Sequence, residues 1–128
     1  KFMAEQYTFD RGEMIINGKL ICNHELIISS LNTSNIKAND INININNAAD
    51  YVFDEDYQMK SLSEIEAFVK ENKHLPGIPS AAEMSENGVS VSTMSNILLE
   101  KIEELTLHLI RLEKENAELK AEFESLEK

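Results

Sequence analysis

The sequence predicts an elongated α+β protein with an intertwined β-strand segment, a small helical collar and a C-terminal parallel coiled coil. Apolar residues recur every five positions within residues 14–46, and Leu recurs every seven positions within residues 93–128. Between them, residues 47–92 carry two helix-capping motifs and a Pro/Gly turn. Residues 1–13 begin with Lys rather than Met, and we expect them to be a leader left from a truncated parent protein.

The β prediction depends on two registers. Strict alternation of Ile and Asn over residues 41–45 is typical of a strand buried on one side. Residues 18–28 also align with residues 33–43 as a fifteen-residue repeat. About thirty residues of this kind cannot bury their own apolar face. We therefore expect strands from several copies to pack through Ile16, Ile21, Leu26, Leu31, Ile36, Ile41 and Ile43. The alternative is a strand layer on the chain's own helix. Cys22 is expected to be a small buried residue.

Two capping boxes predict the collar helices. Ser61 with Glu64 begins a helix over residues 62–73, which should end before Pro76. Ser80 with Glu83 begins a shorter helix that Gly88 can end with a left-handed conformation. The run Pro76 to Pro79 is expected to be a rigid turn.

The coiled coil is predicted by five uninterrupted heptads without Gly or Pro. The d positions are Leu98, Leu105, Leu112, Leu119 and Leu126, and the a positions are Ser95, Ile102, Leu109, Asn116 and Phe123. Such a helix is about 52 Å long, whereas a compact globule of this chain length is roughly 36 Å across. Its distal half must therefore find a partner from another chain.

Charge pairs favour parallel helices. A g residue would face the e residue five positions later, which brings Glu115 near Lys120 and His108 near Glu113, while Glu122 near Glu127 is mildly repulsive. Asn116 at an a position fixes the register and leans toward two strands, although three remain open. The off-seam residues Ile97, Leu99, Leu107 and Ile110 widen the apolar face. We expect the helix over 62–73 to pack there through Phe68 and Val69.

Composition excludes several function classes. The net charge of −11 disfavours nucleic acid and anionic membrane surfaces as partners. No run approaches the ~18 apolar residues of a membrane span. Aromatic residues make up 6% of the chain and Trp is absent, which disfavours a small-ligand pocket. We therefore predict a non-enzymatic protein without a cofactor or metal, whose main partner is itself.

Several stretches resemble a known module: residues 49–57 (ADYVFDEDY), Ser61-Leu62, residues 71–81 (ENKHLPGIPSA), residues 86–89 (ENGV) and residues 99–107 (LEKIEELTL). Residues 35–41 (NIKANDI) resemble a strand phrase that usually precedes them. Together they resemble the C-terminal module of tail-fibre-like proteins of Bacteroidetes bacteria and their phages. The sequence departs from that pattern at Asn46-Asn47, in its two aligned β repeats and in its longer charged coil.

The resemblance implies a homotrimer at the end of a β-rich fibre shaft, in a virion tail fibre or on the cell surface. The implied role is trimerisation and capping of the fibre, with attachment to a host-surface receptor as the wider context. It implies no catalytic residues. A dimer remains the alternative that the coil itself leaves open.

Four sharper hypotheses compete with simpler interpretations. Lys60 with Ser61 or Ser63 could cleave the chain, as in an intramolecular chaperone, but Ser61 also suits a helix cap. Asp54, Asp56 and Gln58 have the spacing of calcium ligands, but Met59 and Ile65 stand where Gly and Glu are needed.

The third and fourth of these hypotheses are a metal site built from histidines and a glycan-binding patch built from aromatic residues. His24, His74 or His108 could gather around a three-fold axis to bind a metal, whereas His74 more simply bonds a backbone carbonyl. A glycan-binding tip could use an exposed aromatic patch, although core packing suits the same residues better: Tyr7, Phe9, Tyr51, Phe53 and Tyr57.

Overall fold

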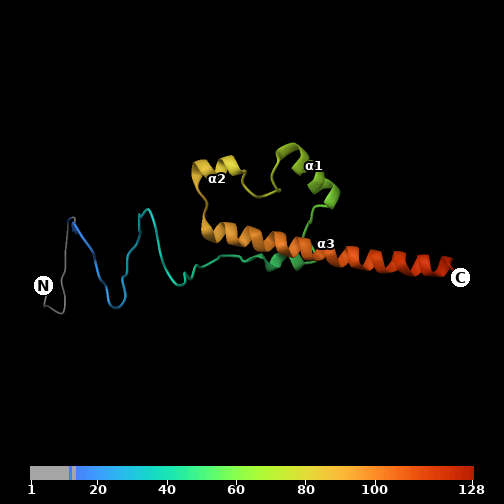
Figure 1. The fold of residues 1–128 in the computed structure, drawn as a ribbon, viewed down its shortest axis with the longest axis horizontal. Coiled ribbons are helices and arrows are strands. Elements are labelled where there is room, and N and C mark those ends of the chain that lie inside the picture. Colours follow the sequence, from blue (N-terminus) through green and yellow to red (C-terminus); the bar gives the residue numbers. More distant parts are fainter. Residues whose placement is uncertain (1–11, 13) are drawn as a thin grey trace. The chain divides into compact units, whose positions relative to one another are not determined.

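The computed structural model describes residue 12 and residues 14–128. Its elements are a 3-10 helix η1 (Ala49–Phe53) and three α-helices, α1 (Leu62–Asn72), α2 (Ala81–Asn87) and α3 (Val91–Leu126) (Figure 1). The chain divides into two units, Lys1–Asn39 and Asp40–Lys128. All four helices belong to the second unit. No described helix is long and apolar enough to cross a membrane.

The predicted α+β class is wrong, because the described residues contain no β-strand. The residues expected to pack between strands are instead exposed to solvent in the single chain: Ile16, Ile21, Leu26, Leu31, Ile36, Ile41 and Ile43. A strand requires a neighbouring strand to pair its backbone N–H and C=O groups. The alternation of Ile and Asn defines which side of a strand would be apolar, but it does not provide a second strand to pair with. Cys22, expected to be buried, is exposed for the same reason.

Both collar helices begin where their capping boxes predict. The Ser61 hydroxyl accepts a hydrogen bond from the backbone N–H of Glu64, whose carboxylate accepts from the backbone N–H of Ser61. Ser80 and Glu83 repeat the same reciprocal pair at α2. Each box satisfies two amides that a helix start leaves unpaired. Both predictions of a helix start are confirmed.

The collar helices also end through the backbone conformation of single residues. Lys73 ends α1 in a left-handed conformation (φ 61°, ψ 20°) and donates its N–H to the carbonyl of Val69. Gly88 ends α2 with φ 70° but ψ −174°, which is not the left-handed helical region predicted for it. A positive φ of this kind is accessible mainly to Gly.

The long helix α3 begins at Ser90, whose hydroxyl accepts from the N–H of Thr93. Its 36 residues span about 54 Å at 1.5 Å per residue. The predicted helix over 93–128 is thus confirmed to within two residues at each end. Its partner within the chain was not predicted. The short η1, rather than α1, packs along α3, whereas Phe68 of α1 meets the ring of His74 edge-on at 5.4 Å.

Candidate self-association site

The candidate site is α3, which presents three different faces. Successive residues of an α-helix turn by about 100°, so positions three or four apart share a face. One face holds η1, a second carries the a and d side chains, and a third borders a groove.

The first face binds η1 and the residues beside it. The side-chain N–H of Asn96 donates to the carbonyl of Asn47 at 3.3 Å, and the Tyr51 hydroxyl donates to Glu100. Ala49 and Val52 of η1 are almost fully buried. On α3, this face also contains Glu103, which is only 7% exposed. The short helix thus buries its two small apolar residues and directs its polar groups onto α3.

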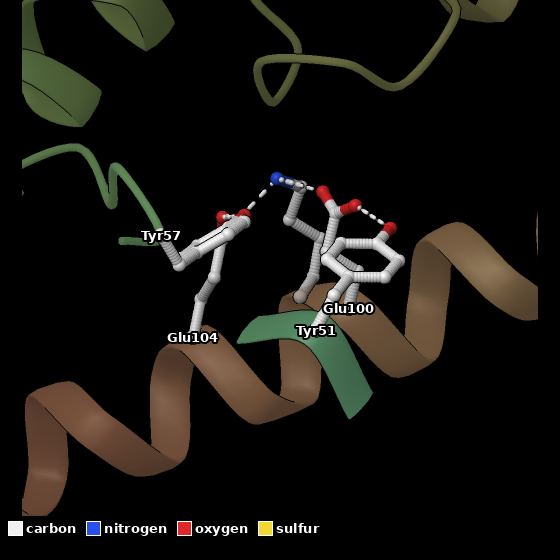
Figure 2. A network of polar contacts seen from close by, with 5 residues as sticks. Tyr51, Tyr57, Glu100 and Glu104 are labelled. Atoms are coloured by element: carbon white, nitrogen blue, oxygen red, sulfur yellow. Dashed lines mark hydrogen bonds and ion pairs between the residues drawn. The ribbon is translucent and has the colours of Figure 1, made fainter. Parts of the chain in front are cut away.

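Two tyrosines and two glutamates form a network around Lys101 (Figure 2). The Tyr57 hydroxyl donates to Glu104 at 2.6 Å. The Lys101 ammonium lies 2.9 Å from a carboxylate oxygen of Glu100 and 2.9 Å from one of Glu104. The tyrosine rings lie 6.0 Å apart, tilted by 43°. One cation therefore joins the two carboxylates that hold the segment 51–57 against α3.

The network shifts the acidities of its members. The hydrogen bond to Glu100, together with burial, raises the pKa of Tyr51 to about 12. Burial and the bond to Glu104 raise the pKa of Tyr57 as well. Burial opposes ionisation of Glu100, but hydrogen bonds from Tyr51 and Lys101 hold its pKa below the ordinary value. The phenols thus remain protonated donors and Glu100 remains a charged acceptor at neutral pH.

Glu103 is the unsatisfied member of the first face. Burial and the neighbouring carboxylate of Asp50 raise its pKa. One of its carboxylate oxygens is buried without a hydrogen-bond partner among the described residues. A buried carboxylate beside a like charge is destabilising when ionised. Nothing in the heptad pattern predicts this burial, since a Glu at an outer heptad position ordinarily faces water.

The second face is the predicted seam, and none of the residues that the structure describes buries it. Its apolar side chains are all exposed, from 42% at Leu112 to 84% at Leu126. Asn116 is exposed beside them. The seam consists of Leu98, Ile102, Leu105, Leu109, Leu112, Asn116, Leu119, Phe123 and Leu126. It lies about 180° around α3 from the face that binds η1, so the chain's own packing leaves it free.

The third face borders a groove of about 380 Å³ beside the seam. Its apolar lining comes from α1 and the following turn, namely Leu62, Ile65, Leu75 and Pro76. On the α3 side it is lined by Glu100, Lys101, Glu104, Leu105 and His108. Leu105 therefore belongs to both the seam and the groove. His108 is only 3% exposed, and neither ring nitrogen has a partner among the described residues.

The burial of His108 corrects one predicted pair. The ring was expected to face Glu113 of a second copy, but its own chain already encloses it. His74 behaves as expected, because its Nδ1 lies 3.0 Å from the carbonyl oxygen of Leu75. His24 lies in the first unit and is exposed. Within the described residues, no three His, Cys, Asp or Glu side chains are grouped to hold a metal ion.

The remaining candidate residues have local roles. The Ser61 hydroxyl caps α1 and lies 3.1 Å from the Ser63 hydroxyl, and no hydrogen bond joins the Lys60 ammonium to either hydroxyl among the described residues. Asp56 accepts through its backbone carbonyl from Gln58. Tyr51 and Tyr57 are half-buried on α3, which leaves Phe53 as the exposed ring of the predicted aromatic patch. Tyr7 and Phe9 lie outside the described residues.

The comparisons with known proteins add no relative. No family model matches the chain, and neither a curated protein nor a solved structure is significantly similar to it.

Proposed function

We propose that this chain is a non-enzymatic self-association module, in which α3 joins three copies in parallel and so closes the end of a fibre-like or surface-adhesin protein. The observation that carries the proposal is the exposed apolar seam of α3. Eight large apolar side chains over five heptads stay exposed, although η1 packs on α3. Knobs-into-holes packing against the same seam of other copies is the simplest way to bury them.

Burial of the seam outweighs the charged pairs at its rim. Burying a Leu or Ile side chain fully contributes about 1.5–3 kcal/mol, whereas an exposed ion pair contributes about 0.2–1 kcal/mol. The pair between Glu115 and Lys120 of neighbouring copies supports a parallel arrangement, although Arg111 of the same chain already lies 3.6 Å from Glu115. We infer that burial of the seam supplies most of the affinity between copies. The charged residues at its rim and Asn116 set the register of the helices.

The number three and the biological setting come from the resemblance to the tail-fibre-like module. In that setting the module would hold three fibre chains together while other parts of the parent protein bind the host-surface receptor. A module of this kind acts by raising the local concentration of the chains it joins. It requires no catalytic group, metal or cofactor.

Paired charge substitutions test the proposal. Leu105→Asp with Leu112→Asp places charges in the seam, and we expect the chains to separate, unfold or aggregate. Ala117→Asp with Ala121→Asp adds the same charge on outer heptad positions and should leave the molar mass unchanged. Light scattering after gel filtration compares the two. A folded assembly of three chains from the seam variant would overturn the proposal.

A further inference from the structure

Two contacts attach η1 to α3, and they require opposite charge states of their glutamates. In the first, the Tyr51 hydroxyl donates to Glu100, whose carboxylate also lies 2.9 Å from the Lys101 ammonium (Figure 2). This contact needs an ionised Glu100. In the second, Asp50 of η1 lies beside Glu103 of α3. Two ionised carboxyls repel each other, so this contact is weakest when both are charged.

Glu103 lacks the surroundings that stabilise a charged carboxylate. It is 7% exposed, and one of its oxygens is buried without a hydrogen-bond partner among the described residues. It is faced by carboxylates from both elements, Asp50 on η1 and Glu100 on α3. The Lys101 ammonium binds Glu100 and Glu104, and no ion pair within the described part of the chain includes Glu103. A proton on Glu103 removes the buried charge and lets its O–H donate to Asp50.

Tyr51, Lys101 and Glu100 keep their charge states in the pH range where Glu103 takes up a proton. The hydrogen bond to Glu100, together with burial, raises the pKa of Tyr51 to about 12. Burial opposes the charge of Lys101, but its two carboxylate partners raise its pKa above 10.5. Burial also opposes ionisation of Glu100, but its hydrogen bonds hold its pKa below 4.5. Burial and Asp50 raise the pKa of Glu103 above 4.5. Near pH 4.5, Glu103 is therefore protonated while Glu100 remains ionised.

We propose that the attachment of η1 to α3 depends on pH and is tightest in mildly acidic solution, where Glu103 is protonated beside Asp50 while Glu100 keeps its charge. The contribution of Glu103 is complete below the ordinary glutamate pKa and is lost as the pH rises through its raised value. The contribution of Glu100 has the opposite sign, because it is lost as the pH falls through its lowered value. The attachment therefore weakens on both sides of a maximum.

This dependence on pH goes beyond the proposed function, because all the groups involved belong to one chain. They lie on the first face of α3, about 180° around the helix from the seam. The residues just before η1 are held to α3 by the hydrogen bond from Asn96 to Asn47, which carries no charge. The change that we propose is thus a local loosening of η1 at neutral pH, with α3 itself unchanged.

Amide hydrogen exchange of the intact chain tests the proposal. The N–H of Asp50 donates to the carbonyl of Ala48 and that of Asp54 to the carbonyl of Tyr51, so both amides are protected while η1 stays formed. Their exchange rates would be divided by the intrinsic rate at each pH, since that rate itself varies with pH. Between about pH 7 and about pH 3, we expect protection to rise several-fold to a maximum near pH 4.5 and then to fall. Protection that is constant, or that changes in only one direction, would overturn the proposal.

Matched variants identify the carboxyl responsible. Glu103→Gln keeps a side chain that can donate a hydrogen bond to Asp50 but removes the charge. We expect its η1 amides to be several-fold better protected at pH 7 than those of the parent, without a further rise toward acid. Glu113→Gln removes the same charge at an exposed position of α3 and should keep the profile of the parent. Equal changes in the two variants would show that overall charge sets the profile and would overturn the proposal.

A titration of the unmodified chain covers the case in which Glu103→Gln does not fold. The carbon-13 shift of each carboxyl group reports directly where it takes up its proton. We expect the Glu103 carboxyl to be protonated at a pH above 4.5 and the Glu100 carboxyl below it. A Glu103 carboxyl that takes up its proton at or below pH 4.5 would overturn the proposal.

Discussion

The two halves of α3 differ in how much of their surroundings the single chain supplies. In residues 91–108, η1 covers one face, a groove borders another, and Glu103 and His108 are buried. In residues 109–126, every side chain is exposed. The same heptad pattern runs through both halves. The first half therefore has supporting contacts within the chain, whereas no described residue buries the apolar side chains of the second half.

Removal of the second half should have the largest effect. A chain that ends at His108 keeps the contacts of Tyr51 and Tyr57 with α3 but only two seam heptads, so we expect single chains at micromolar concentration. Sedimentation velocity measures this. A chain that ends at Phe123 is the matched control and should remain associated. If the chain ending at His108 associates as tightly as the parent, the assignment of affinity to the second half is wrong.

Asn116 should limit stability while it fixes the register. Asn116→Leu replaces a polar a position by an apolar one, and we expect the melting temperature of the assembly to rise by several degrees with a broader distribution of copy numbers. Thermal unfolding followed by circular dichroism, together with native mass spectrometry, measures both. A lower melting temperature with one unchanged copy number would argue against an axial Asn116.

The tyrosine network should contribute less than the seam to the free energy of unfolding, and only in the first half of α3, residues 91–108. Tyr57→Phe removes the hydrogen bond to Glu104, and we expect a loss of about 1 kcal/mol in the free energy of unfolding. Combining it with Glu104→Gln should cost less than the sum of the single changes, because both remove the same contact. Strictly additive losses in urea titrations would show that the contact does not form in solution.

Substitution of Glu103 should give the smallest change in stability. Unlike the change at Tyr57, it should stabilise the folded chain, by an amount that depends on pH. Its pKa is raised in the folded chain, so the folded state favours the protonated form. Stability from this group is therefore complete below the ordinary Glu pKa and is lost as the pH rises through the raised value. We expect Glu103→Gln to melt at a higher temperature than the parent at pH 7, with the difference shrinking toward pH 4. A difference independent of pH would contradict this.

Local signals in the sequence were sufficient where the structure depends on neighbours in the chain. Ser61 with Glu64, and Ser80 with Glu83, predict their helix starts because each box involves groups three residues apart. The heptads predict α3 because periodicity defines a helical face without reference to a partner. The segment that packs against a given face, in contrast, can lie far away in the sequence. The alternation over residues 41–45 therefore led to a wrong strand assignment, since it could not supply a second strand.

The first face of α3 could not be predicted for the same reason. Tyr51 lies 49 residues from Glu100, and Tyr57 lies 47 residues from Glu104. The single turn η1 has no helical periodicity, and its two buried side chains, Ala49 and Val52, are too small to stand out in the sequence. The a and d positions form an exposed apolar stripe on α3, and their predicted role in joining copies of the chain stays a prediction.

The molar mass of the intact chain in solution tests the central claim most directly. Light scattering over a concentration series from micromolar to millimolar should give three times the 14.5 kDa of one chain. A stable mass of two chains would favour the preference of Asn116 over the resemblance to the tail-fibre-like module. A single-chain mass throughout the series, with α3 fully helical, would contradict the claim that the exposed seam joins copies of this chain.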